Sequence, residues 1–176
     1  MPVSGKTWTP FLNPICWLCM SDIFRKIRLK PSQMRTVASR RFDDAQFLCD
    51  SKQNARANAA MYLGGFVLEC LLKATLMEKF RWLQSAGSPE GRSKEDHKLW
   101  SLCYRSHDLD EILKQVPEVF DRIEQFEQKG HMRLAQSLKK LCANWTIYAR
   151  YSTQSTDCTE AIHFVEQIKE LRQCLK

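Results

Sequence analysis

A carboxylate and an amine lie four residues apart in the most apolar segment of the chain. The segment runs from Asn58 to Leu76 (NAAMYLGGFVLECLLKATL), and Glu69 and Lys73 are its only charges. On a helix this spacing places both side chains on one face, where they can form an ion pair. Burying an unpaired charge is costly, so the pair needs each other, a further partner or water. Two interpretations follow: a buried tie that fixes the register of the helices, or a contact to a ligand.

Two adjacent glycines precede this pair by one turn. Gly64 and Gly65, with Ala60 a turn earlier, lack side chains that would keep a neighbour away. A helix interior ordinarily prefers alanine to glycine by about 1 kcal/mol at each position. The glycines therefore predict a close approach, either by another helix of the chain or by a second copy.

A histidine lies beside a predicted helix start. Asp108 and Glu111 have the spacing of a capping box, in which side chains satisfy free backbone N–H groups. The neighbouring His107 is expected near a helix N-terminus, which makes an imidazole less basic and favours anions. His107 could contact a phosphate, or it could simply pack at the cap.

An arginine and a tyrosine, Arg150 and Tyr151, precede the last predicted helix. Arg150 could reach Glu69 and close a polar network between the second helix and the final loop. The residues predicted for ligand binding or for this network are Glu69, Lys73, His107, Asp108, Arg150 and Tyr151. No cofactor and no metal site are predicted, since Cys16 and Cys19 form a lone C-x-x-C pair and zinc needs four ligands.

The elements that must position these residues are helices, because alternating β-branched runs are absent and apolar residues recur at helical spacing. We predict an all-α up-and-down bundle of about five helices. The predicted helices cover 34–50, 53–80, a stretch from 108, 131–148 and 157–174, with loops at 84–98 and 150–157. Pro117 is expected to open either a continuation of the third helix or a new one.

The basic charge is confined to the N-terminal part of the chain. The net charge is +7, of which +6 lies between Met20 and Arg41, and residues 42–176 are balanced. We divide the chain into a basic arm or extension, residues 1–33, and a helical domain, residues 34–176. Such an arm could touch phosphates or anionic lipid, or it could be a solvated segment.

Cysteine usage and hydropathy indicate a cytoplasmic protein. Most of the eight cysteines, among them Cys49, Cys70 and Cys142, fall on apolar helical faces, where thiols behave as small hydrophobic groups. Reduced thiols are typical of a cytoplasm. No stretch reaches the roughly 20 apolar residues of a membrane span.

Three motifs in this order resemble those of the HEPN family, small four-to-five-helix bundles named for nucleotide binding in higher eukaryotes and prokaryotes. They are YLGGFVLECLLKATL with Glu69 and Lys73, the His107-Asp108-Leu109 helix start, and Arg150 with Tyr151. The resemblance covers Arg40 to Leu175. It implies a homodimer whose long helices face each other, with a groove near the charged residues.

The resemblance also implies a choice of functions: ribonuclease, toxin paired with a nucleotidyltransferase antitoxin, or inert helper module. Ribonuclease members carry an arginine followed four to six residues later by a histidine, late in the bundle. Here the formal match is Arg92 and His97, in a polar loop, and the next histidine after Arg150 is His163. We therefore expect a binding and dimerisation module without ribonuclease activity. The alternatives are a metal-independent ribonuclease using His107 or Arg150, and direct binding of a nucleotide near Glu69, Lys73 and Arg150.

Overall fold

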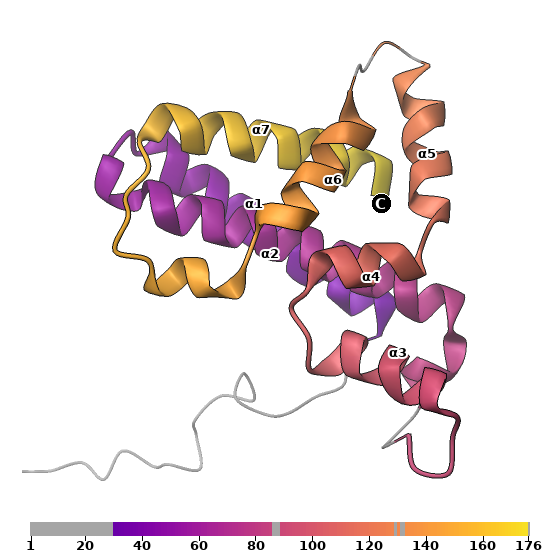
Figure 1. Ribbon diagram of the computed structural model, residues 1–176. Coiled ribbons are helices and arrows are strands. Elements are labelled where there is room, and N and C mark those ends of the chain that lie inside the picture. The colour runs from indigo at the N-terminus through magenta and orange to yellow at the C-terminus, as the bar shows by residue number, and fades with distance from the viewer. Residues whose placement is uncertain (1–29, 86–88, 129, 131–132, 176) are drawn as a thin grey trace, which may run out of the picture.

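Every regular element in the described part of the chain is helical, which confirms the predicted all-α class. The computed structural model describes residues 30–85, 89–128, 130 and 133–175. The α-helices in these residues are α1 (Pro31–Asp50), α2 (Asn54–Lys79), α3 (Lys94–Tyr104), α4 (Leu109–Gln115), α5 (Glu118–Glu127), α6 (Leu134–Asn144) and α7 (Cys158–Leu175) (Figure 1). Two 3₁₀ turns, η3 (Arg81–Gln84) and η4 (Ile147–Tyr151), complete the set. The expected number of about five helices was too low.

One additional helix, α3, begins inside the segment expected to be a loop. The side chain of Ser93 accepts a hydrogen bond from the backbone N–H of Asp96, at 3.1 Å, and so caps the helix. Its apolar residues Leu99, Leu102 and Cys103 are buried. The polar composition of 84–98 concealed this start, because a helix N-terminus prefers the serine and acidic residues that also mark loops.

A further helix arises because the stretch from residue 108 is divided at Val116. This residue precedes Pro117 and has a non-helical backbone, with φ −127° and ψ 57°. The ring of a proline disfavours the helical conformation in the residue before it. Of the two expectations for Pro117, a continued helix or a new one, the structure shows a new one, α5.

Two helix boundaries also differ from the expected ones. α1 starts at Pro31, where the ring has a suitable φ and the missing N–H is not needed. The expected helix 131–148 is shorter, because α6 ends at Asn144 and the chain continues into η4. Most of the predicted arm, including Cys16 and Cys19, lies outside the described residues.

Three long helices, α1, α2 and α7, lie side by side (Figure 1). α7 runs in the same direction as α2, since Asn54 at the start of α2 accepts a hydrogen bond from the N–H of Cys158 at the start of α7. Further along, Gly64 of α2 faces Phe164 and Ile168 of α7. The shorter helices α3 to α6 connect these two parallel helices.

The centre of the fold is α2. All residues from Val67 to Met77 are buried, including the charged Glu69 and Lys73. Among the helices in the described ranges, α2 alone is long and apolar enough to cross a membrane, yet most of its apolar segment is enclosed by the rest of the chain. Packing within the domain thus accounts for its composition.

Candidate functional site

The buried ion pair of α2 forms as its spacing predicts. Lys73 Nζ donates a hydrogen bond to Glu69 Oε1 at 2.7 Å, and the two side chains are 7% and 4% exposed. Nζ also donates to the backbone carbonyl of Ser106 at 2.8 Å. This carbonyl lies in the turn before α4, so the amine ties α2 to a segment 33 residues further along the chain. A backbone acceptor leaves no signal in the sequence, and the role of Ser106 was not predicted.

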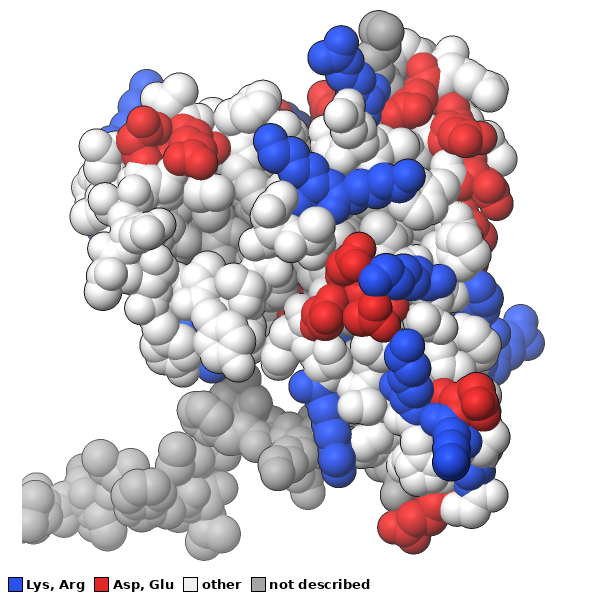
Figure 2. All heavy atoms as spheres, viewed as in Figure 1, with Lys and Arg blue, Asp and Glu red and all other residues white. Residues whose placement is uncertain are grey.

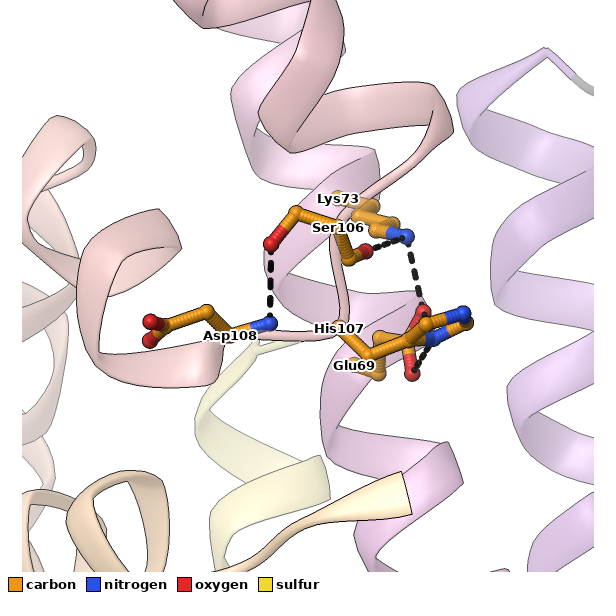
Figure 3. A network of polar contacts seen from close by, with 5 residues as sticks. All are labelled: Glu69, Lys73, Ser106, His107 and Asp108. Atoms are coloured by element: carbon orange, nitrogen blue, oxygen red, sulfur yellow. Dashed lines mark hydrogen bonds and ion pairs between the residues drawn. The ribbon is translucent and has the colours of Figure 1, made fainter. Parts of the chain in front are cut away.

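His107 completes this network (Figure 3). Its Nδ1 lies 3.0 Å from both carboxylate oxygens of Glu69. A carboxylate can only accept hydrogen bonds, so Nδ1 of His107 is the protonated ring nitrogen and donates a hydrogen bond to Glu69. The side chain of His107 is 39% exposed, whereas that of Glu69 is 4% exposed. Glu69 is therefore shared between Lys73 and His107, and the network joins two of the three sequence motifs.

Asp108 turns away from this network. Its backbone N–H donates to Oγ of Ser106 at 3.0 Å (Figure 3). Its carboxylate accepts a hydrogen bond from the backbone N–H of Glu111 at 3.0 Å. The second contact confirms Asp108 as the cap of α4. The reciprocal half of a capping box is replaced by the serine hydroxyl.

The third motif is not part of the network. Arg150 is exposed on η4, and its guanidinium lies 4.7 Å from the centre of the Tyr151 ring. No ion pair or hydrogen bond in the described part of the chain joins Arg150 to Glu69. The carboxylate that Arg150 was expected to reach is occupied by Lys73 and His107 instead.

Aromatic side chains from elsewhere in the same chain pack against the two glycines of α2. A Cβ atom on Gly65 would lie 1.8 Å from Nε1 of Trp145, and one on Gly64 would lie 2.7 Å from the ring of Phe164. The sequence left open whether another helix of the chain or a second copy approaches Gly64 and Gly65. The structure shows that the approach is made by the chain itself, through Trp145, just after α6, and Phe164 on α7.

One groove next to this network, the His107 groove, has a volume of about 590 Å³ and lies between the start of α4 and η4. Its lining includes Arg105, Asp108, Asp110 and Tyr148 besides His107. Cys142 also lines it, but burial, reinforced by the charges of Asp110 and Asp108, raises the pKa of this thiol to about 12. The thiol is therefore protonated at neutral pH and is no nucleophile.

A second groove, the α6–α7 groove, has a volume of about 1060 Å³. It is lined by α6, η4, α7 and the first half of α2. Trp145 and Thr146 line both grooves and form the wall between them. Of the exposed aromatic side chains of η4, Tyr148 lines the His107 groove.

The residues that formally match a ribonuclease signature do not gather near His107. Arg92 lies 4.3 Å from the ring centre of Trp82 and 3.6 Å from the carboxylate of Asp96. His97 is exposed on α3. Within the described ranges, no group of three or more histidine, cysteine or acidic side chains is placed to hold a metal ion.

Comparison with family models, with curated proteins and with solved structures finds no match to this chain.

Proposed function

We propose that this chain is a HEPN-like helical module that acts by binding a partner protein in the cytoplasm and does not cleave RNA. A nucleotidyltransferase in a toxin–antitoxin or defence setting, as in prokaryotes, is the partner that the resemblance suggests. The protein is proposed to work as a homodimer. The motif order and the internal geometry support this proposal together.

The observation that carries the proposal is the surface of η4. Tyr148 and Tyr151 are 73% and 69% exposed, and Arg150 lies between them. Tyrosine and arginine are enriched among the residues that anchor protein interfaces. A tyrosine buries a large area for little loss of conformational freedom, and an arginine offers several hydrogen-bond donors on a planar group. Tyr148 also lines the His107 groove, so a partner that covers these side chains would lie at the edge of that groove.

The internal contacts argue against ribonuclease chemistry. General base catalysis and stabilisation of a charged phosphorane require a histidine and an arginine at one substrate. In this chain His107 contacts Glu69, whereas Arg150 contacts Tyr151. Arg105 lines the same groove as His107, but its guanidinium lies 4.7 Å from the ring centre of Trp100.

Nucleotide binding at Glu69 and Lys73 is disfavoured for a similar reason. Both charges are buried and have partners within the chain, so a nucleotide would have to displace Glu69 or Ser106 from the amine. Isothermal titration with ATP is expected to give no heat at millimolar concentration. Heat that disappears in Lys73→Met would contradict this.

The decisive experiment is an RNA cleavage assay with the concentrated, folded protein in EDTA. No cleavage is expected for the wild type, for Arg150→Ala or for His107→Ala. Metal-independent cleavage by the wild type that is lost in both variants would overturn the proposal. The product of an adjacent nucleotidyltransferase gene, where there is one, should bind the wild type and lose affinity for Tyr148→Ala/Tyr151→Ala.

A further inference from the structure

We infer that the α6–α7 groove receives an acidic amphipathic helix of the partner protein. This inference rests on the proposed function and adds to it the place and chemistry of the contact. This groove is larger than the His107 groove, and the Glu69 network does not include any of its residues. Its volume of about 1060 Å³ is at the upper end of small-molecule pockets, which hold roughly 300–1,000 Å³.

The floor of the groove is apolar. Met61 and Tyr62 come from α2, Trp145 follows α6, and Phe164 comes from α7. All four are half-buried, so they retain surface that a partner can cover. Covering such surface is favourable at roughly 25 cal/mol per Å² of apolar area.

One side of the groove is basic. Arg133, Lys139 and Lys140 line it, all three are exposed, and Glu160 is the acidic residue on the other side. Figure 2 shows basic side chains (Lys or Arg) over α6 and acidic side chains over the start of α4. None of the three cations forms an ion pair with another described residue, although Lys139 lies 5.0 Å from the ring centre of Phe120.

The neighbouring His107 groove lacks this basic character, since Asp108 and Asp110 line it together with a single arginine, Arg105. An acidic partner is therefore attracted more strongly to the α6 side of Trp145 and Thr146 than to the α4 side. Such complementarity determines where a partner docks and in which orientation.

The aromatic side chains favour a helix over a nucleic acid. Single-stranded nucleic acids stack their bases on free ring faces. In this groove the ring of Tyr62 already lies between Phe66 and Trp145, with centroids 6.5 and 6.2 Å away. The edge of Trp145 is held against Gly65. A helix that lays apolar side chains into a groove needs no free ring faces.

The test is a selection from a displayed library of random 16-residue peptides against the full chain, followed by affinity measurements on synthetic copies. We expect acidic sequences with apolar residues at i, i+3, i+4 and i+7. Lys139→Glu/Lys140→Glu and the groove-filling Gln136→Trp should each weaken binding by about tenfold or more. Lys94→Glu, a matched charge reversal on exposed α3, should leave the affinity unchanged.

Other outcomes overturn the inference. Peptides without acidic amphipathic character, an empty selection, or binding that ignores both groove variants would exclude this occupant. A fluorescent oligo(U) that binds and is released by the lysine substitutions would assign the groove to nucleic acid. A change from dimer to monomer in Lys139→Glu/Lys140→Glu would assign it to a second copy. The proposed function is tested separately, because it would be contradicted by RNA cleavage in EDTA and not by the result of the peptide selection.

Discussion

The indole of Trp145 takes the place that a side chain would have at Gly65. An added Cβ would lie 1.8 Å from Nε1, 2.1 Å from Cδ1 and 2.3 Å from Cε2 of this ring. Nε1 itself is buried and has no hydrogen-bond partner among the described residues. The close approach therefore gives packing at the expense of an unsatisfied N–H.

We expect Gly65→Ala to destabilise the protein by about 3 kcal/mol, at the upper end of overpacking effects. The gain in helix propensity, about 1 kcal/mol, is too small to compensate. Gly64→Ala is the matched control and should cost less, because its Cβ would lie 2.7 Å from the nearest atom of Phe164 and 3.5 Å from Ile168, a smaller overlap than at Gly65. Urea unfolding followed by circular dichroism measures both. Equal stability of Gly65→Ala and the wild type would contradict the position of Trp145.

The buried thiols are expected to make the free energy of unfolding depend on pH in the alkaline range. Burial raises the pKa of Cys70 and Cys142 from 9.0 to about 12, and that of Cys103 to about 11. Above pH 9 the unfolded chain loses these protons while the folded protein keeps them. The free energy of unfolding must then fall as the pH rises.

Unfolding measured between pH 8 and 10.5 should show this decrease. The triple variant Cys70→Ala/Cys103→Ala/Cys142→Ala should show a smaller slope, whatever its stability at pH 8. Cys158→Ser serves as the control, since this thiol is only half-buried. A slope that is identical in the wild type and the triple variant would refute the assignment to the thiols.

The proposed homodimer can use only part of α2. Because the chain's own helices bury Val67 to Met77, a second copy can reach only the first half of α2, its last two residues and the outer face of α7. Ile162 on α7 is 38% exposed. We expect a dimer mass at micromolar concentration by light scattering, and a shift toward monomer in Ile162→Glu but not in Lys94→Glu. A monomeric wild type would count against the dimer.

The long helices could be predicted from sequence because their apolar residues repeat at helical spacing. Ala38, Phe42, Ala45 and Cys49 are buried along α1, as that spacing requires. Two of the short helices, α4 and α6, were also predicted, but α3 was not, since it begins in a polar segment. Whether the helix from residue 108 continues past Pro117 was left open, and α4 ends at Gln115 because the proline disfavours a helical Val116. Local patterns indicate that a helix exists more reliably than where it ends.

The candidate site was predictable to a similar extent. The pairing of Glu69 with Lys73 follows from spacing within one helix. The contact of Glu69 with His107 joins residues 38 apart, and the amine of Lys73 finds a backbone carbonyl. Long-range partners of this kind depend on how helices pack. The sequence therefore suggested Arg150 as the partner of Glu69, whereas in the fold the partner is His107.

Substitutions in the network of Glu69, Lys73 and His107 test whether it stabilises the fold. Glu69→Gln removes the charge that compensates Lys73, and breaking one side of a buried pair typically costs about 3–5 kcal/mol. We expect a loss of this size in urea unfolding. Arg41→Ala, which breaks the surface pair with Asp44, is the control and should cost about 1 kcal/mol or less.

Replacing both charges distinguishes a buried tie from a group kept for ligand contact. Glu69→Leu/Lys73→Met removes the two buried charges together, so it should cost less than Glu69→Gln alone and can even stabilise the protein. If this double variant keeps the partner affinity of the wild type, the pair acts only on the fold. If it folds with wild-type stability but no longer binds, the polar network is part of the binding site, and the structural interpretation of Glu69 and Lys73 is wrong.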